Sequence, residues 1–285
     1  MKEFTMVITM KKKVMLLLLS FMTITHVVSG EEKLKIEKGE FITIAHRGAS
    51  AYAPEHTMQS YKLAKEMNAD YLEIDVQMTK DGVPIAYHDH KLDDKTDWKG
   101  EIEQYRLDEI KQIDIGKWFG EDFQGAKILT LEEIFKRFGT DTNYYIELKK
   151  TNKGVEKTVY DLLLKYDLNL SNGQVIIQSF SQDSLLRMKS LNVRIPLIKL
   201  LEDENALNLT EQKLKEITSY AAGVGVNYKA VTKDFVDLAH NNNLLVHAYT
   251  VNQLKVMNEM LELGVDGMFT NKPDVLLELS LSFTY

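Results

Sequence analysis

The sequence predicts an α/β fold built on a mostly parallel sheet, and its length favours a single TIM-type (β/α)8 barrel. Short runs of β-branched and aromatic residues alternate with polar turns and helical patterns, which is typical of βαβ units. The chain has 285 residues, and one such barrel takes about 250. A doubly wound open sheet gives the same alternation but usually carries a glycine-rich turn after its first strand. The HRGAS turn found here does not match that pattern.

The expected strands are short and nearly continuous in apolar residues, a pattern that fits strands buried on both faces. They lie at 41–46, 71–76, 84–88, 144–148, 174–179, 194–200, 223–226, 244–249 and 267–270. Helical patterns separate them, for example at 57–67, 131–138, 155–166, 181–191, 233–241 and 251–263. Nine candidate strands are one more than a barrel needs.

The third candidate strand is expected to form a hairpin with the second. Only the residues TKDG separate EIDVQM from VPIAYH, which is too short for a parallel crossover. Asp81-Gly82 is a strong signal for a two-residue hairpin turn. Such a turn pairs Lys80 with Val83 and, counted outward, Asp75 with His88, so it predicts a carboxylate and an imidazole side by side.

Three regions are expected along the chain. Residues 1–30 contain Lys11–Lys13, a short apolar run and small residues before a charged segment, which is typical of a secretory signal peptide. The run from Val14 to Val28 is shorter than a membrane span, although an uncleaved anchor is the alternative. Residues 31–285 form one barrel domain, with an insertion at about 93–127 near its mouth. The protein is therefore expected to be secreted or held at the cell surface, without stable membrane insertion after cleavage.

Charge and composition narrow the possible partners. Residues 1–30 carry a net charge of +3, so removing them takes the total from −7 to about −10. That charge argues against nucleic acid as a partner, because its binding rests on cationic contacts to phosphate. The chain has no cysteine, which excludes disulfides and thiolate metal sites.

Acidic side chains near the ends of two strands predict a metal site. Glu73 and Asp75 are two residues apart and so share one face of a strand. Inside a barrel, unpaired charges are very costly, so the pair needs a cation. Glu147 offers a third carboxylate, and this oxygen-rich set suits Ca²⁺ or Mg²⁺. The alternative is that Glu73 points outward or pairs with a lysine.

Two histidines follow other strands and are candidates for acid–base catalysis. His46 and His88 come at strand ends, where barrel enzymes carry their active sites. Two imidazoles can divide proton transfers between a nucleophile and a leaving oxygen. Arg47 is suited to a bidentate phosphate contact, and Lys149 adds a point charge. His247 is left open between the core and the pocket wall.

The motifs together resemble those of the glycerophosphodiester phosphodiesterases. They read HRGASAYAPEHT, EIDVQMTKDGVPIAYHD, LTLEEIF, YIELK, QSF, YTVN and FTNKP, in this order, from about Ile42 to Pro273. The resemblance implies a barrel of the phospholipase C-like kind with a small insertion after the third strand. It also implies metal-dependent hydrolysis of a small glycerophosphodiester to an alcohol and glycerol 3-phosphate.

The same resemblance assigns roles to residues of this chain. It implies His46 and His88 as the acid–base pair, a divalent cation on Glu73, Asp75 and Glu147, and substrate contacts from Arg47, Glu55, Lys149 and Tyr249. It also implies a two-step reaction, in which the glycerol 2-hydroxyl attacks phosphorus and water then opens the cyclic phosphate.

This sequence departs from the usual motifs at three points. His56 stands where the family usually has Asn, Tyr249 stands for Trp, and ILTLEE replaces IPTLEE. The first departure puts the fine-tuning of substrate binding in doubt, whereas the other two are conservative. No departure removes an expected ligand or base.

Three other functions compete with this interpretation. A related barrel phosphodiesterase, either a phospholipase C or a lysophospholipase D, would act on lipids and favour an exposed apolar rim. A non-catalytic glycerophosphodiester-binding protein would not need His46 and His88. An amidohydrolase-type barrel using His88-Asp89-His90 would need HxH at the end of the first strand, which has HRG instead.

Overall fold

The computed structural model describes residues 41–149, 154–168, 172–191, 194–207 and 209–283. The expected signal peptide at 1–30 lies outside these residues. Among the described helices, none is both long and apolar enough to cross a bilayer.

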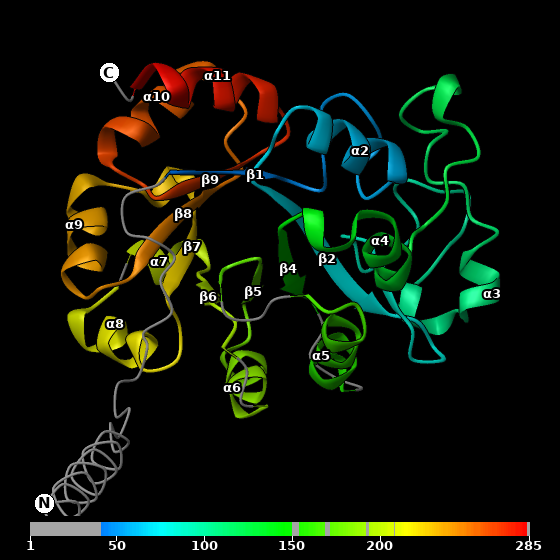
Figure 1. The fold of residues 1–285 in the computed structure, drawn as a ribbon, viewed down its shortest axis with the longest axis horizontal. Helices are drawn as coiled ribbons and strands as arrows, with labels where there is room; N and C mark the ends of the chain where they lie inside the picture. The colour runs from blue at the N-terminus through cyan, green and yellow to red at the C-terminus, as the bar shows by residue number, and fades with distance from the viewer. Residues whose placement is uncertain (1–40, 150–153, 169–171, 192–193, 208, 284–285) are drawn as a thin grey trace, which may run out of the picture. The chain divides into compact units, whose positions relative to one another are not determined.

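Eight parallel strands close into a barrel, which confirms the predicted fold class (Figure 1). The ring runs β1-β9-β8-β7-β6-β5-β4-β2, and pairing between β1 and β2 closes it. The strands are β1 (Ile42–Ala45), β2 (Tyr71–Met78), β4 (Tyr144–Leu148), β5 (Val175–Ser179), β6 (Leu197–Leu200), β7 (Gly223–Asn227), β8 (Leu245–Tyr249) and β9 (Gly267–Thr270).

The ninth strand, β3 (Pro84–Ala86), pairs antiparallel with β2 and lies outside the ring. The hairpin prediction is therefore confirmed, but its register is wrong by one residue. Gly82 takes a left-handed φ of +80°, and Thr79 N donates to Val83 O at 3.0 Å. These contacts define a three-residue loop in place of the predicted two-residue turn, so Asp75 pairs with Tyr87 rather than with His88.

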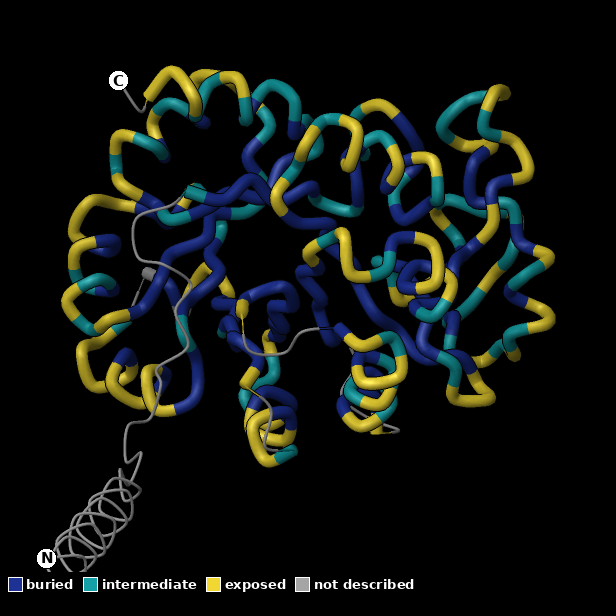
Figure 2. Tube along the Cα trace, in the orientation of Figure 1, coloured by how far each residue is buried: buried dark blue, intermediate teal, exposed yellow. Residues whose placement is uncertain are grey.

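Helices surround the strands, and their exposed residues lie on the outside (Figure 2). Threonine and serine side chains accept hydrogen bonds from backbone amides at several helix starts, at Thr57, Thr130, Ser181, Thr210 and Thr232, as expected for N-caps. The helices are α2 (Met58–Glu66), α3 (Leu107–Ile110), α4 (Leu131–Phe138), α5 (Val155–Lys165), α6 (Gln182–Ser190), α7 (Asp203–Leu207), α8 (Glu211–Thr218), α9 (Lys233–Asn241), α10 (Leu254–Leu263) and α11 (Pro273–Phe283).

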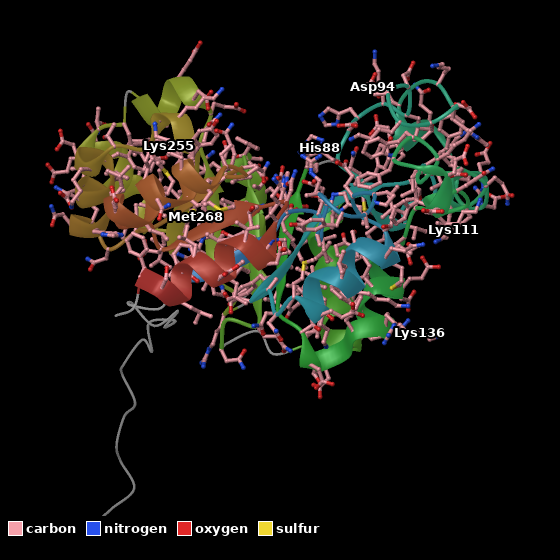
Figure 3. The ribbon with its side chains drawn as sticks, turned by 90° about the horizontal axis from the view of Figure 1, so that it is seen from above. His88, Asp94, Lys111, Lys136, Lys255 and Met268 are labelled. Carbon is pink, nitrogen blue, oxygen red and sulfur yellow. The ribbon has the colours of Figure 1, made fainter. Side chains whose placement is uncertain are left out.

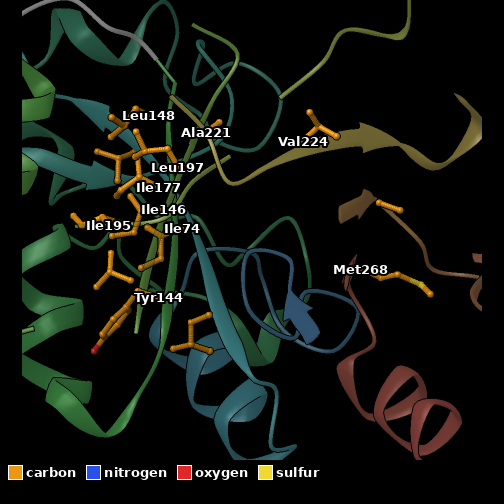
Figure 4. Close-up of a cluster of buried hydrophobic side chains, with 14 of the residues drawn as sticks. Ile74, Tyr144, Ile146, Leu148, Ile177, Ile195, Leu197, Ala221, Val224 and Met268 are labelled. Carbon is orange, nitrogen blue, oxygen red and sulfur yellow. The ribbon is translucent and has the colours of Figure 1, made fainter. Parts of the chain in front are cut away.

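The main core fills the layer between the strands and the helices. Because side chains alternate along a strand, one set packs outward against the helices, as Figure 4 shows for Ile74, Ile146 and Ile177. The other set points into the barrel, where Ile44, Tyr145 and Phe269 belong to a second cluster. This interior layer leaves the carboxyl ends of the strands for polar side chains.

The segment at 93–127 forms a small lobe beside α4 (Figure 1), with an apolar cluster that it shares with β3. Ile102, Ile110 and Ile113 are fully or almost fully buried in this cluster together with Ile85 of β3. The lobe contains α3 and two short 3-10 helices, Ile102–Gln104 and Glu121–Phe123. It therefore packs on the extra strand that leads from the barrel to His88.

Candidate active site

A cavity of about 220 Å³ opens at the carboxyl ends of the strands. One wall is charged, and the opposite wall is largely apolar. The cavity contains eight of the nine residues predicted for the site, all except Glu55. Its lining is His46, Arg47, Glu73, Asp75, His88, Glu147, Lys149, Gln178, Phe180, Leu200, Tyr249, Thr250 and Phe269.

Three buried carboxyl groups meet in the charged wall. Glu73 and Asp75 are each 1% exposed, and Glu147 is 7% exposed. Asp75 on β2 is paired in register with Glu147 on β4, so these two side chains are neighbours across the sheet. The structure thus places the three acids predicted from the sequence together in one wall of the cavity.

Crowding and burial make this cluster electrostatically unfavourable on its own. Burial and then repulsion from Asp75 raise the pKa of Glu73 well above its usual value. The same two causes raise the pKa of Glu147 to about 8. Burial also acts to raise the pKa of Asp75, but Lys149, His56 and Arg47 together hold it well below its usual value. The positive charge of Lys149 and Arg47 is therefore not enough to keep all three carboxyl groups ionised together.

These residues fit a divalent cation. Glu147 Oε1 is buried without a well-directed hydrogen bond, although Lys149 Nζ lies 3.2 Å away. Donor atoms of His56, Glu73 and Asp75 lie within 4.8 Å of one another, close enough to share one ion. Carboxylate oxygens are the preferred ligands of hard divalent ions, so a cation here would relieve the repulsion that burial magnifies.

His56 occupies a position that sequence reasoning treated only as a departure. Its ring is 1% exposed and bonds Asp75 Oδ2 through Nε2 at 2.9 Å and Tyr61 OH through Nδ1 at 2.7 Å. Its backbone φ is +56°, a left-handed conformation in which Asn and His are both enriched. Burial, opposed by the bond to Asp75, lowers the pKa of His56. His56 therefore fixes the orientation of the Asp75 carboxylate through a buried hydrogen bond.

His46 follows β1 directly, and its ring is held in one orientation. Its Nδ1 lies 2.7 Å from Asn271 Oδ1, and because an amide oxygen only accepts, Nδ1 carries the hydrogen. The other ring nitrogen, Nε2, is then an acceptor. Burial, followed by the charge of Arg47, lowers the pKa of His46 to about 3. The ring is therefore neutral at physiological pH. Asn271 was not singled out from the sequence.

His88 lies at the entrance to the site, between the barrel and the inserted lobe (Figure 3). Gln77 on β2 positions it by donating from Nε2 to the carbonyl oxygens of Tyr87, His88 and Asp89. The His88 ring bonds Asp89 Oδ1 through Nδ1 at 2.6 Å. His88, first through this bond, lowers the pKa of Asp89 well below its usual value. The histidine therefore has an ionised carboxylate as its partner.

Arg47 is fixed by its backbone and by two acids. Its amide donates to Glu73 Oε2 at 2.7 Å, and its NH1 donates to Glu55 Oε2 at 3.0 Å. The Nε atom lies 3.4 Å from Asp75 Oδ2 without a directed hydrogen bond. Glu55 does not line the cavity, so the structure places it behind Arg47 as its anchor.

The opposite wall is aromatic. Tyr249 donates from its hydroxyl to Leu201 O at 2.8 Å and packs edge-on against Phe180 and Phe269. Because its hydroxyl is used by the backbone, the ring presents an apolar surface to the cavity. His247, left open by the sequence, is fully buried below this wall and bonds Tyr145 OH through Nδ1 at 2.8 Å.

Comparison with known proteins identifies the family. The model of the glycerophosphoryl diester phosphodiesterase family matches residues 46–275, which include all nine predicted site residues. This chain belongs to the glycerophosphoryl diester phosphodiesterase family. The family model begins at His46, the first histidine of the site.

Individual relatives agree with that assignment. A glycerophosphodiester phosphodiesterase of Bacillus subtilis (strain 168) is 42% identical over 90% of this chain and 92% of its own length. One from Caldanaerobacter subterraneus subsp. tengcongensis is 32% identical over 84% of this chain and 97% of its own. A phosphodiesterase of Oleispira antarctica, solved with the product sn-glycerol-3-phosphate, is 27% identical with a TM-score of 0.73 over 83% of this chain and 95% of its own.

Proposed function

We propose that this chain hydrolyses glycerophosphodiesters to an alcohol and glycerol 3-phosphate. The proposal rests mainly on one observation. Two histidines line the same cavity as three buried carboxyl groups, and the two rings have chemically different partners. His46 has an amide oxygen, whereas His88 has a carboxylate. This difference between the partners supports separate acid and base roles for the two histidines.

His46 acts as the base in the first step. Its Nδ1–H is held by Asn271, so Nε2 presents a lone pair, and burial keeps the ring neutral by lowering its pKa to about 3. The base accepts the proton of the glycerol 2-hydroxyl while that oxygen forms its bond to phosphorus. Arg47 and Lys149, on the charged wall, balance the negative charge of the phosphoryl oxygens.

His88 acts as the acid in the same step. Its Nδ1 donates to the carboxylate of Asp89, which orients the ring. The protonated ring delivers its proton to the alcohol oxygen as the bond from that oxygen to phosphorus breaks. In the second step, His88 takes a proton from water, and His46 returns its proton to the 2-oxygen of the cyclic phosphate.

A divalent cation completes the site. We propose Ca²⁺ or Mg²⁺, because the donor set of Glu73, Asp75 and Glu147 is made of carboxylate oxygens, with His56 as a neighbouring nitrogen donor. When bound, such an ion neutralises charge on the phosphoryl oxygens. The protein supplies burial, orientation and the two proton-transfer groups.

Export is a further part of the proposal. The basic and apolar pattern of residues 1–30 supports a signal peptide and a secreted or cell-surface enzyme. Mass spectrometry of the protein recovered outside expressing cells tests this directly. We expect a chain that begins near Glu31, and a full-length chain retained in the cytoplasm would contradict the proposal.

The activity is tested with a panel of glycerophosphodiesters that differ in their alcohol, with release of glycerol 3-phosphate as the readout. The wild type is expected to accept several alcohols. His46→Ala and His88→Ala are each expected to lose about 100-fold or more in kcat, while circular dichroism shows an unchanged fold. Near-wild-type turnover by either variant would refute the assignment of the acid–base pair.

A further inference from the structure

We propose that Lys95, in the inserted lobe, is a positioning residue for this reaction that holds the partners of both His88 and Arg47. The inference rests on the proposed function. It extends the role of the lobe from shaping access to the cavity to ordering the groups that act inside it.

The geometry consists of two carboxylates that each use one oxygen for Lys95 and the other for a cavity residue. Lys95 Nζ donates to Asp89 Oδ2 and to Glu55 Oε1, both at 2.7 Å. The second oxygen of Asp89 lies 2.6 Å from His88 Nδ1. The second oxygen of Glu55 accepts from Arg47 NH1 at 3.0 Å. One ammonium group therefore links the supports of two functional residues.

The ion pairs of Lys95 with Glu55 and Asp89 are largely withdrawn from solvent and are therefore stronger than exposed surface pairs. The side chains of Lys95, Glu55 and Asp89 are 19%, 18% and 24% exposed. Exposed ion pairs contribute little because water screens them, whereas charges withdrawn from water depend on their partners. Without the ammonium group, Asp89 and Glu55 would face each other with no shared cation, and Asp89 would have one fewer contact fixing its orientation.

The lobe holds Lys95 from the other side. Thr96 Oγ1 donates to Leu92 O at 2.8 Å and accepts from Trp98 N at 3.0 Å. Leu92 is fully buried in the apolar cluster of the lobe. The Lys95 ammonium also lies 5.8 Å from the centre of the Trp118 ring, within range of a cation–π contact. The position of Lys95 is therefore set by the folding of the lobe.

A positioning role predicts a dependence on the leaving group. If Lys95 acts through His88, its loss weakens proton delivery to the departing alcohol. The alkoxide of choline is a poor leaving group and needs that proton, whereas p-nitrophenolate is a good leaving group and departs without one. A purely structural role would lower both activities by the same factor, because it would reduce only the amount of folded enzyme.

The experiment compares glycerophosphocholine with the p-nitrophenyl ester of glycerol 3-phosphate, using the full-length chain with metal. Lys95→Met is expected to lower the rate of choline release from glycerophosphocholine, the first step, by about 10- to 100-fold, and the rate of p-nitrophenol release from the nitrophenyl ester by a much smaller factor. Lys95→Arg, which keeps the charge and the two contacts, is expected to restore most of the loss. Lys99→Met, at an exposed lysine of the same lobe, serves as the matched control and retains wild-type rates.

The outcomes separate the inference from the proposed function. Equal losses in the rate of alcohol release from the two substrates, or no loss on either, would overturn the role of Lys95 in holding the partner of His88. A wild type that releases no glycerol 3-phosphate would instead refute the function. His88→Ala should show the same substrate pattern as Lys95→Met, because both act on the same proton. Should Lys95→Met fail to fold, Lys95→Gln allows the same comparison.

Discussion

Replacing Glu147 by Gln tests whether the acidic cluster is strained when no cation is bound. The Glu147 side chain is 9% exposed, and Asp75 faces it across β4 and β2. Burial and Asp75 raise the pKa of Glu147 from 4.5 to about 8. Glutamine has the same shape but no charge, so the substitution removes the repulsion and leaves the packing in place.

The direction of the pH effect follows from linkage between proton binding and folding. Because the pKa is higher in the folded state, the stability that this group contributes is complete below pH 4.5 and is lost as the pH rises through 8. With about 1.4 kcal/mol for each tenfold difference in proton affinity, the wild type loses about 3 kcal/mol from this group between pH 4.5 and pH 7. The Gln variant loses none of it.

The assay is urea unfolding in a chelator, followed by circular dichroism at both pH values. Relative to wild type, Glu147→Gln is expected to gain up to about 3 kcal/mol in free energy of unfolding between pH 4.5 and pH 7. Glu262→Gln, at an exposed acid, controls for the chemical change itself. If Glu147→Gln instead loses stability relative to wild type over this range, the cluster is not strained and the reasoning is wrong.

Two further predictions concern the scaffold. Burial lowers the pKa of His247 to about 4, so the stability from its neutral ring is present above pH 6.5 and is lost as the pH falls, by about 3 kcal/mol at pH 4. His247→Phe should therefore lose less unfolding free energy between pH 7 and pH 4 than the control Tyr145→Phe, which keeps the imidazole. Equal losses of unfolding free energy in the two variants would contradict this prediction. Gly48 has φ +83°, and a Cβ there would lie 2.6 Å from Ser60 Oγ. Gly48→Ala is expected to cost about 2 kcal/mol, measured as a lower melting temperature, and an unchanged melting temperature would refute the steric argument.

Much of the barrel was predictable because its strands carry strong local signals. The runs YYIEL and GMFT coincide with β4 and β9 in the structure, since each is a short apolar stretch between polar turns. The alternation of side chains also placed Glu73 and Asp75 on one interior face. These inferences needed only residue order and period.

The hairpin shows where local reasoning failed. Asp81-Gly82 indicated a turn correctly, but Gly82 occupies the third position of a longer loop. A slip of one residue changes every cross-strand partner. The predicted pairing of Asp75 with His88 was therefore wrong, although both side chains line the cavity. Gln77, rather than strand pairing, holds the His88 segment in place.

Contacts across long sequence separations could not be predicted from the sequence. Lys95 meets Glu55 at a separation of 40 residues, and His46 meets Asn271 at 225. No period or motif encodes such pairs, because they depend on how the lobe and the last strand return to the barrel mouth. His56 is a similar case, since its bond to Asp75 became visible only in three dimensions.

The most direct test of this account is metal-dependent release of glycerol 3-phosphate from glycerophosphocholine. Protein stripped with EDTA should be inactive, and titration with Ca²⁺ or Mg²⁺ should restore turnover in the wild type but not in Glu73→Gln. Full activity in excess chelator, or full restoration of Glu73→Gln, would contradict the claim that the buried acids hold a catalytic cation.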